Sequence, residues 1–237
     1  MARGTTLVRL LDKLRIAAGL SLNPAHNDND RPFQVGLLQD EQDRLWDDFD
    51  WPHLRIERQV PIQAGQRYYD TPEEIHVDRL EKIEFFSDGA WRPLDAGIGP
   101  EHYTAWNSDL DERSWPPRRW KIHEDEDIEL WPISDQNGVA ATREGYLKFT
   151  GIRNLNPLVD EQDRCDLDDQ MLVNFVAATI LARDGSKDAQ LKLQAATARY
   201  ARLRGNMSPR QKFRLFGEPT APALNRIRIT QYRPPSS

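Results

Sequence analysis

The sequence predicts an α+β protein with helices at both ends of the chain and strands between them. Apolar residues recur at helical spacing before residue 52 and again after residue 157, whereas apolar and polar residues alternate from 54 to 152. The final segment is basic and broken by proline. We therefore expect a helical bundle from residues 1–52 and 158–205, a β-rich insertion domain at 53–157, and an extended C-terminal tail at 206–237.

The first expected helix runs from Leu7 to Ala18, because apolar residues form a narrow stripe along it. Thr5 or Thr6 can cap its start and Gly19 can end it. The second expected helix begins near Pro32, since a helix accepts proline in its first turn. Leu38, Gln42, Leu45 and Phe49 repeat along it at helical spacing, with Trp46 beside them on the same stripe.

The second helix should stop at Trp51-Pro52, because the proline ring disfavours helical geometry in the residue before it. An extended run from Leu54 to Ile62 follows directly. The junction therefore connects a helical layer to a sheet, and we expect Phe49 and Trp51 to be buried supports at this corner.

Between the two helical regions, the alternation predicts two hairpins and a last strand. A short helix is expected at Pro100–Asn107. Trp115-Pro116-Pro117 and Trp131-Pro132 should lie at strand ends or sheet edges, because proline cannot donate to a ladder. The expected hairpins pair Leu80–Phe86 with Trp91–Leu94 and Trp120–His123 with Ile128–Trp131, and the last strand is Tyr146–Ile152.

Two further helices are expected after Pro157. Asp166 or Asp168 can cap the third helix, which carries apolar residues on several sides and must therefore lie mid-bundle or meet another subunit. The fourth helix should end at Gly205. Its predicted apolar stripe is Ala189, Leu193, Ala196, Tyr200 and Leu203.

Composition excludes some classes of function. The chain has 237 residues and a formal charge of −6, which argues against a general grip on nucleic acid. The single cysteine, Cys165, excludes an internal disulfide and fits a reducing compartment of synthesis. Charges interrupt the stretch from Leu7 to Leu22, so we expect no signal peptide, and the longest apolar run, Met171–Ala182, is too short to span a membrane.

One acidic turn offers oxygen ligands of the kind that calcium or magnesium accepts. It contains Glu124, Asp125, Glu126 and Asp127 and follows His123. The twelve-residue calcium loop is absent, so a solvated turn is the simpler interpretation, and we expect no metal, cofactor or catalytic residue. A metal-dependent hydrolase using this cluster stays the alternative. A second acidic cluster, Asp160–Asp169, suits a loop and a helix N-terminus.

The tail carries six basic residues against Glu218 alone. It also holds two apolar segments, Phe213–Phe216 and Asn225–Tyr232, the second of which alternates like a strand. Such a segment is weakly ordered alone and can fold on a partner, for example by adding a strand to an exposed sheet edge. Nucleic-acid binding through this basic tail is the other alternative.

The order of elements and several motifs resemble the head-to-tail adaptor proteins of tailed bacteriophages, also described as connector or tail tubular proteins. The resemblance extends from about Leu7 to Gly205 and includes the closing pair of helices. The motifs that carry it are Leu45–Leu54, Pro61–Tyr69, Asp78–Ile83, Trp91–Leu94 and Phe149–Arg153.

The resemblance implies a structural virion protein without enzymatic activity, made in the host cytoplasm and placed at the head–tail junction. It implies a twelve-fold ring that binds the portal protein on one side and a downstream tail or nozzle protein on the other. Genomic DNA passes through the lumen during ejection without specific binding, and no membrane is involved. The lumen acids would include Glu124, Asp125, Glu126 and Asp127, with the Asp160–Asp169 loop as a further candidate. The residues expected to contact the portal are Phe213, Arg214, Leu215, Phe216, Arg226, Ile227, Arg228, Ile229 and Tyr232.

Overall fold

The computed structural model describes residues 3–23, 26, 29–107 and 110–207. The chain up to Met207 forms one compact unit built from helices and mainly antiparallel sheets. The predicted α+β class is therefore confirmed. The predicted tail lies outside the described residues from Ser208 onwards.

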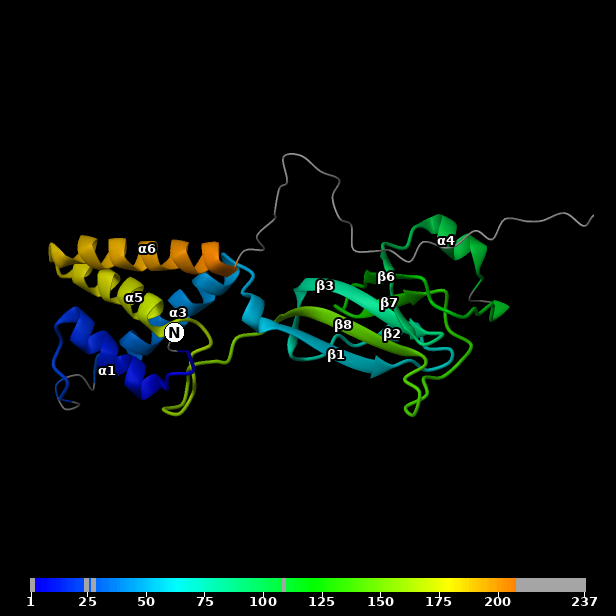
Figure 1. Cartoon of the computed structure of the whole chain (residues 1–237), viewed down its shortest axis with the longest axis horizontal. Coiled ribbons are helices and arrows are strands. Elements are labelled where there is room, and N and C mark those ends of the chain that lie inside the picture. The colour runs from blue at the N-terminus through cyan, green and yellow to red at the C-terminus, as the bar shows by residue number, and fades with distance from the viewer. Residues whose placement is uncertain (1–2, 24–25, 27–28, 108–109, 208–237) are drawn as a thin grey trace, which may run out of the picture. The chain divides into compact units, whose positions relative to one another are not determined.

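Four helices share one hydrophobic core, and they come from both ends of the described chain (Figure 1). The central helix is α5, which packs against the other three and is apolar on several sides for that reason. Of the two roles that the sequence left open for this helix, the mid-bundle one is confirmed. The helices are α1 (Leu7–Ala18), α3 (Arg31–Asp47), α5 (Asp169–Arg183) and α6 (Asp188–Met207).

Two adjacent carboxylates at the start of α5 connect these helices. Asp168 is the N-cap of α5, where its Oδ1 accepts the backbone N–H of Met171 at 3.0 Å. The guanidinium of Arg199, on α6, donates to both oxygens of Asp168 at 2.5 and 2.7 Å. Asp169 accepts from Lys13 on α1 and, at 3.1 Å, from the hydroxyl of Thr5. Both carboxylates are buried, so the two ends of the described chain are joined by ionic hydrogen bonds.

Three details of the helices differ from the prediction. Helix α6 continues through Gly205 to Met207. Glycine lowers the stability of a helix by only about 1 kcal/mol relative to alanine, so it does not by itself end one. Leu193 belongs to the predicted apolar stripe of α6, but its side chain is 42% exposed and lines a surface groove. Thr6 occupies the N-cap position of α1 without a capping side-chain bond, and the hydroxyl of Thr5, the other predicted cap, donates to Asp169 instead.

The corner after α3 matches the prediction for Trp51, whereas Phe49 is only partly buried. Trp51 is buried, and its indole N–H donates to the carbonyl of Leu45 at 2.9 Å. Phe49 packs edge-on against Trp51 with ring centroids 5.1 Å apart. A single turn of 3-10 helix, η1 (Pro52–Leu54), then leads into the first strand. Burying the indole here orients the chain as it leaves the helices.

The first sheet has the order β1-β8-β3-β4. Strand β8 is the last in the chain yet lies between β1 and β3, so the sheet closes only when the end of the β region returns to its beginning. The hairpin of β3 and β4 turns at Asp88 and Gly89, whose φ angles are 52° and 75°, as a tight two-residue turn requires. The strands are β1 (Arg55–Pro61), β3 (Ile75–Ser87), β4 (Ala90–Pro93) and β8 (Tyr146–Arg153).

The second sheet has the order β2-β7-β6-β5, with β5 parallel to β6. The predicted hairpin of β6 and β7 is confirmed, and β7 ends at Trp131, before Pro132. The predicted short helix is α4 (Pro100–Ala105). The strands are β2 (Tyr68–Tyr69), β5 (Asp95–Ala96), β6 (Arg119–Ile122) and β7 (Ile128–Trp131). Residues from both sheets share a second hydrophobic core, separate from the helical one.

A cation connects the end of α3 to strand β3. Arg79 donates to the carbonyls of Trp46 and Asp47 at 2.6 and 2.8 Å, which satisfies two of the free carbonyls at the helix C-terminus. Its guanidinium also lies 3.9 Å from the ring centroid of Trp46. Arg79 sits at an irregularity in β3, beside Gly151 of β8, where an added Cβ would come within 2.9 Å of the Arg79 carbonyl oxygen.

Replacing Asp168 tests the tie between α5 and α6. We expect Asp168→Ala to lower the free energy of unfolding by about 3 kcal/mol, because it removes an N-cap and leaves Arg199 without its carboxylate. Asp168→Asn keeps a capping oxygen and should cost roughly 1 kcal/mol less. Urea titrations measure both. As a control, Glu81→Gln breaks the exposed pair with Arg55 and should change stability by under about 1 kcal/mol. Equal effects of Asp168→Ala and of the control would contradict a stabilising role for the contact of Asp168 with Arg199.

Candidate functional site

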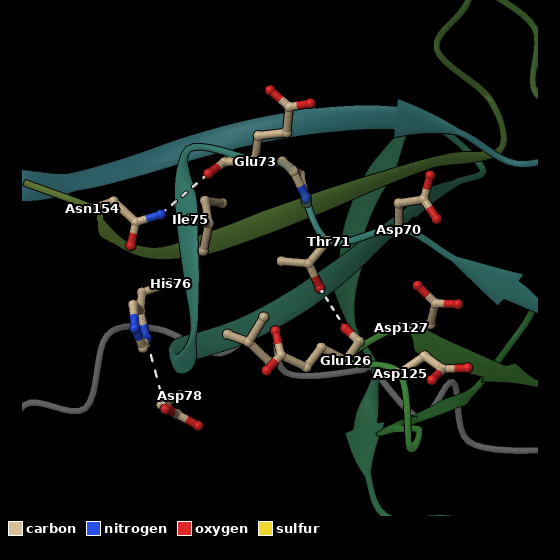
Figure 2. Close-up of a pocket in the computed structure, with 12 residues that line it drawn as sticks. Asp70, Thr71, Glu73, Ile75, His76, Asp78, Asp125, Glu126, Asp127 and Asn154 are labelled. Carbon is tan, nitrogen blue, oxygen red and sulfur yellow. Dashed lines mark hydrogen bonds and ion pairs between the residues drawn. The ribbon is translucent and has the colours of Figure 1, made fainter.

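A groove in the β region is rich in acids, which make up half of its twelve lining residues (Figure 2). Its volume is about 630 Å³ and it is open to solvent. One wall is the segment that connects β2 to β3 and continues into β3, and the other is the turn between β6 and β7. The six acids in its lining are Asp70, Glu73, Asp78, Asp125, Glu126 and Asp127.

A hydrogen bond holds the two walls of the acidic groove together. The hydroxyl of Thr71 donates to the carbonyl of Glu126 at 3.2 Å, as Figure 2 shows. The turn is closed by the His123 carbonyl, which accepts from Glu126 N–H at 3.1 Å, and by His123 N–H, which donates to Asp127 at 2.8 Å. Glu126 has a φ of 63°, a left-handed conformation. The backbone is therefore fixed while the carboxylates of the turn extend into solvent.

The groove has a strongly negative surface. No lysine or arginine occurs among the described residues that line it, and His76 is the one basic side chain there. The Nδ1 atom of His76 lies 3.9 Å from a carboxylate oxygen of Asp78, and its ring packs against Trp46. A surface of this charge repels polyanions and attracts cationic segments. Across residues 3–23, 26, 29–107 and 110–207, no group of three or more His, Cys, Asp or Glu is arranged to hold a metal ion.

The structure places the four acids of the predicted turn on the surface, and three of them in this groove. Glu124 is exposed but does not line it. Sequence reasoning missed the opposite wall, Asp70, Glu73 and Asp78. The one feature of the sequence that points to this wall is the polar stretch before the expected strand at residue 80. Nothing in the sequence indicates that this stretch faces the β6–β7 turn. The predicted portal-contact residues, Phe213 to Tyr232, lie outside the described residues.

The second acidic cluster, Asp160–Asp169, serves the fold. Asp166 accepts from Arg153 at 2.5 and 3.0 Å and from the backbone and side chain of Asn156. Asp163 accepts two backbone N–H groups of its own loop. Since Asp168 and Asp169 are buried in ion pairs, they cannot offer free carboxylates to a lumen. The expectation of lumen acids in this loop is therefore wrong for Asp168 and Asp169.

A buried carboxylate lies two residues after the acidic turn. Glu129, on β7, has a fully buried side chain. It accepts hydrogen bonds from Arg67 at 2.8 Å and from the Tyr103 hydroxyl at 2.9 and 3.0 Å, and it pairs with Lys121 at 3.0 Å. Because Tyr103 belongs to α4, this network fixes that helix to the second sheet. Burial alone raises the pKa of Glu129, but the bonds from Arg67, Lys121 and Tyr103 outweigh it and lower the pKa.

The single thiol is not a reactive group. Cys165 is buried, and its Sγ donates to the side-chain oxygen of Gln42 at 3.2 Å. Burial, with smaller contributions from neighbouring aspartates, raises the pKa of the thiol to about 12. The reactive thiolate form is therefore scarce at neutral pH.

Comparison with families of known proteins defines the class as a structural adaptor of bacteriophages. A family model described as SU10 adaptor protein matches residues 5–223, which is nearly the whole chain. The chain therefore belongs to the SU10 adaptor protein family, a family of phage head–tail adaptors. This membership places it at the head–tail junction of the virion, in contact with portal and tail proteins.

A comparison with curated proteins gives no match. None of the helices that the structure describes combines the length and the apolar character that crossing a membrane requires.

The Glu129 network makes a prediction about stability and pH. Glu129→Gln should lower the free energy of unfolding at pH 7 by about 2 kcal/mol, because Arg67 and Lys121 lose their shared carboxylate but stay partly hydrated. The folded pKa of Glu129 lies below its ordinary value of 4.5, so its contribution is complete above that pH and is lost as pH falls towards the folded value. Denaturation of both proteins at several pH values measures this.

The difference between wild type and Glu129→Gln should therefore shrink on acidification. Glu124→Gln removes an exposed acid from the same hairpin and is the matched control, with an expected change within about 0.5 kcal/mol. A difference for Glu129→Gln that grows in acid would show that the sign is wrong.

Proposed function

We propose that this chain forms a twelve-membered ring that joins the capsid portal to the tail and lets the genome pass through. The observation that carries this proposal is the family match over residues 5–223. A ring built by head-to-tail contacts closes on itself and provides a channel on the symmetry axis of the junction. The role is mechanical, and no catalytic step is part of it.

We assign a separate role to each of the two parts of the subunit that have their own hydrophobic core. One core belongs to the helices and the other to the two sheets, which supports a helical bundle (1–52 and 158–205) with a β-rich insertion domain (53–157). We assign the bundle to the ring and the β-rich region to the tail side. Helix α6 includes Asn206 and Met207, two residues that the sequence analysis assigned to the extension.

Attachment to the portal is assigned to the C-terminal extension. Its basic residues would steer it to an acidic groove on the portal, and its apolar residues would anchor it there. Ordering a chain segment costs about 1–2 kcal/mol per residue, so charge alone is insufficient and the anchors are needed. The proposed contacts are Phe213, Arg214, Leu215, Phe216, Arg226, Ile227, Arg228, Ile229 and Tyr232.

Passage of DNA is assigned to a lumen that carries acids. The acidic groove supports this, because it presents six carboxylates and its described lining offers no lysine or arginine to hold phosphates. Asp125, Glu126 and Asp127 are the proposed lumen residues within the groove, with Glu124 beside them. Repulsion by a negative wall lets the genome slide without binding.

Removing the extension tests the proposed attachment. A chain that ends at Met207 should form rings and unfold like the full chain, because its two cores are complete, but should no longer join purified portal. Cosedimentation with portal measures this. Deletion of residues 234–237 alone removes none of the proposed anchors and should leave portal joining intact. Normal mounting of the chain that ends at Met207 would refute the assignment.

Neutralising the groove tests the proposed lumen. Asp125→Asn with Asp127→Asn should raise the affinity of rings for short DNA duplexes by about tenfold near 50 mM salt, and the gain should fade as salt screens it. Fluorescence anisotropy measures the affinity. The matched control, Glu101→Gln with Asp135→Asn, removes the same charge from exposed sites elsewhere in the β region.

Two outcomes would count against the lumen assignment. An equal change of DNA affinity in the groove variant and the control would show that the groove is not special. Loss of a metal-dependent hydrolytic activity in the groove variant would support the hydrolase alternative instead.

A further inference from the structure

Helix α6 has a face without a partner in its own subunit. Of its twenty residues, Ala196 and Leu203 are the ones that are buried. The outer face carries Leu191, which is 65% exposed, and then Ala195, Ala198 and Arg202 at spacings of four, three and four residues. These spacings place the four side chains in one row along the helix. Within the described part of the chain, Arg202 makes no hydrogen bond or ion pair.

The opposite sign of charge lies on the outer face of α3. Asp40, Asp43 and Asp47 follow Gly36 with the same spacings of four, three and four residues, and all three acids are exposed. Partial burial, then the charges of Asp47 and Asp40, raise the pKa of Asp43. Three like charges in one row destabilise an isolated helix; Asp47 has Arg79 at 3.8 Å in its own subunit, and a further positive charge beside Asp43 would stabilise the row.

The two rows match in polarity as well as in spacing. The first half of the α3 face is uncharged, with Gly36 preceded by Phe33, which is 45% exposed. An added Cβ on Gly36 would meet nothing within 4 Å, so packing inside the subunit does not demand this helix-weakening residue. On α6 the apolar residue Leu191 also comes first and the cation Arg202 last. A parallel arrangement with Leu191 on Gly36 therefore sets the apolar ends together and places Arg202 opposite Asp47, one helical turn from Asp43, while the two alanines lie opposite Asp40 and Asp43.

One subunit cannot make this contact with itself. The C-terminal end of α3 meets α6 through its C-cap residue Asp48, which accepts from the hydroxyl of Tyr200 and lies 3.5 Å from Arg204. Arg202 is two positions from each of these residues, which places it on the opposite side of α6. The outer face of α6 therefore points away from the α3 helix of the same subunit. A contact between these two faces requires a second copy and is head-to-tail, the type that generates rings.

We propose that the outer face of α6 of one copy packs in parallel on the acidic face of α3 of the next copy, and that this contact repeats around the ring. The proposal rests on the proposed function, since it names the surface through which the ring closes. Arg202 pairs with Asp43 and Asp47 of the neighbour, while Leu191 covers Gly36. Lys192, one position after Leu191, adds to the positive charge of α6. The alanines between these ends let the two helices approach closely.

Charge reversal tests the contact. Asp43→Arg and Arg202→Glu should each raise the protein concentration at which half of the subunits are in rings by at least about tenfold, because each places like charges together. Both changes in one chain should restore assembly to within about threefold, since every contact then joins an arginine to an acid again, with the two charges exchanged. Mass photometry measures the assembly, and thermal melting confirms that each variant is folded.

Matched controls are Glu101→Arg and Arg118→Glu, which reverse exposed charges in the β region and should leave assembly unchanged. Rings that form normally in both single variants would overturn the proposed contact and leave the proposed ring intact. Failure of the double variant to recover, with its fold preserved, would also overturn it. If the wild-type chain forms no ring, alone or with portal, both the contact and the ring proposal fail.

Discussion

The helical part of this adaptor depends on two neighbouring carboxylates. Asp168 and Asp169 lie where α5 begins, and each is buried against a cation from a different end of the described chain. Removing a carboxylate from water is costly unless hydrogen bonds satisfy it. Here Arg199, Lys13, Thr5 and the first turn of α5 supply those bonds, so the carboxylates are stable only when α1, α5 and α6 are together. The last helices of the described chain must therefore pack against the first helix before the helical bundle is complete.

Acidic residues have different roles in different parts of this chain. Between residues 160 and 169, carboxylates accept hydrogen bonds from the loop, from Arg153 and from the helices, so they stabilise the fold. In the turn before β7 the carboxylates project into solvent beside those of the β2–β3 connection. Glu129, within the same hairpin, is fully buried and holds α4. The surroundings of each acid, and not its presence in a cluster, decide whether it is free to meet a partner.

Much of the fold was predictable, because local rules decide it. The spacing of apolar residues and the positions of the prolines predict the helices, the two hairpins and the corner at Trp51, and the structure agrees. The end of α6 was mispredicted at Gly205, since an exposed glycine only weakens a helix and does not stop it. The pairing of β8 between β1 and β3, and the second wall of the acidic groove, depend on contacts between segments far apart in the chain. A single sequence contains no local signal for such contacts.

Together these features describe a subunit with two hydrophobic cores, one in the helices and one between the sheets. Family membership gives the setting, the head–tail junction, and the buried ion pairs of Asp168 and Asp169 join the helices from both ends of the described chain. The most direct test is electron cryomicroscopy of the junction in intact virions. The account predicts twelve copies in a ring beneath the portal, with residues 208–237 of each copy against portal subunits. Density that places the chain elsewhere in the virion, or as isolated copies without a ring, would contradict it.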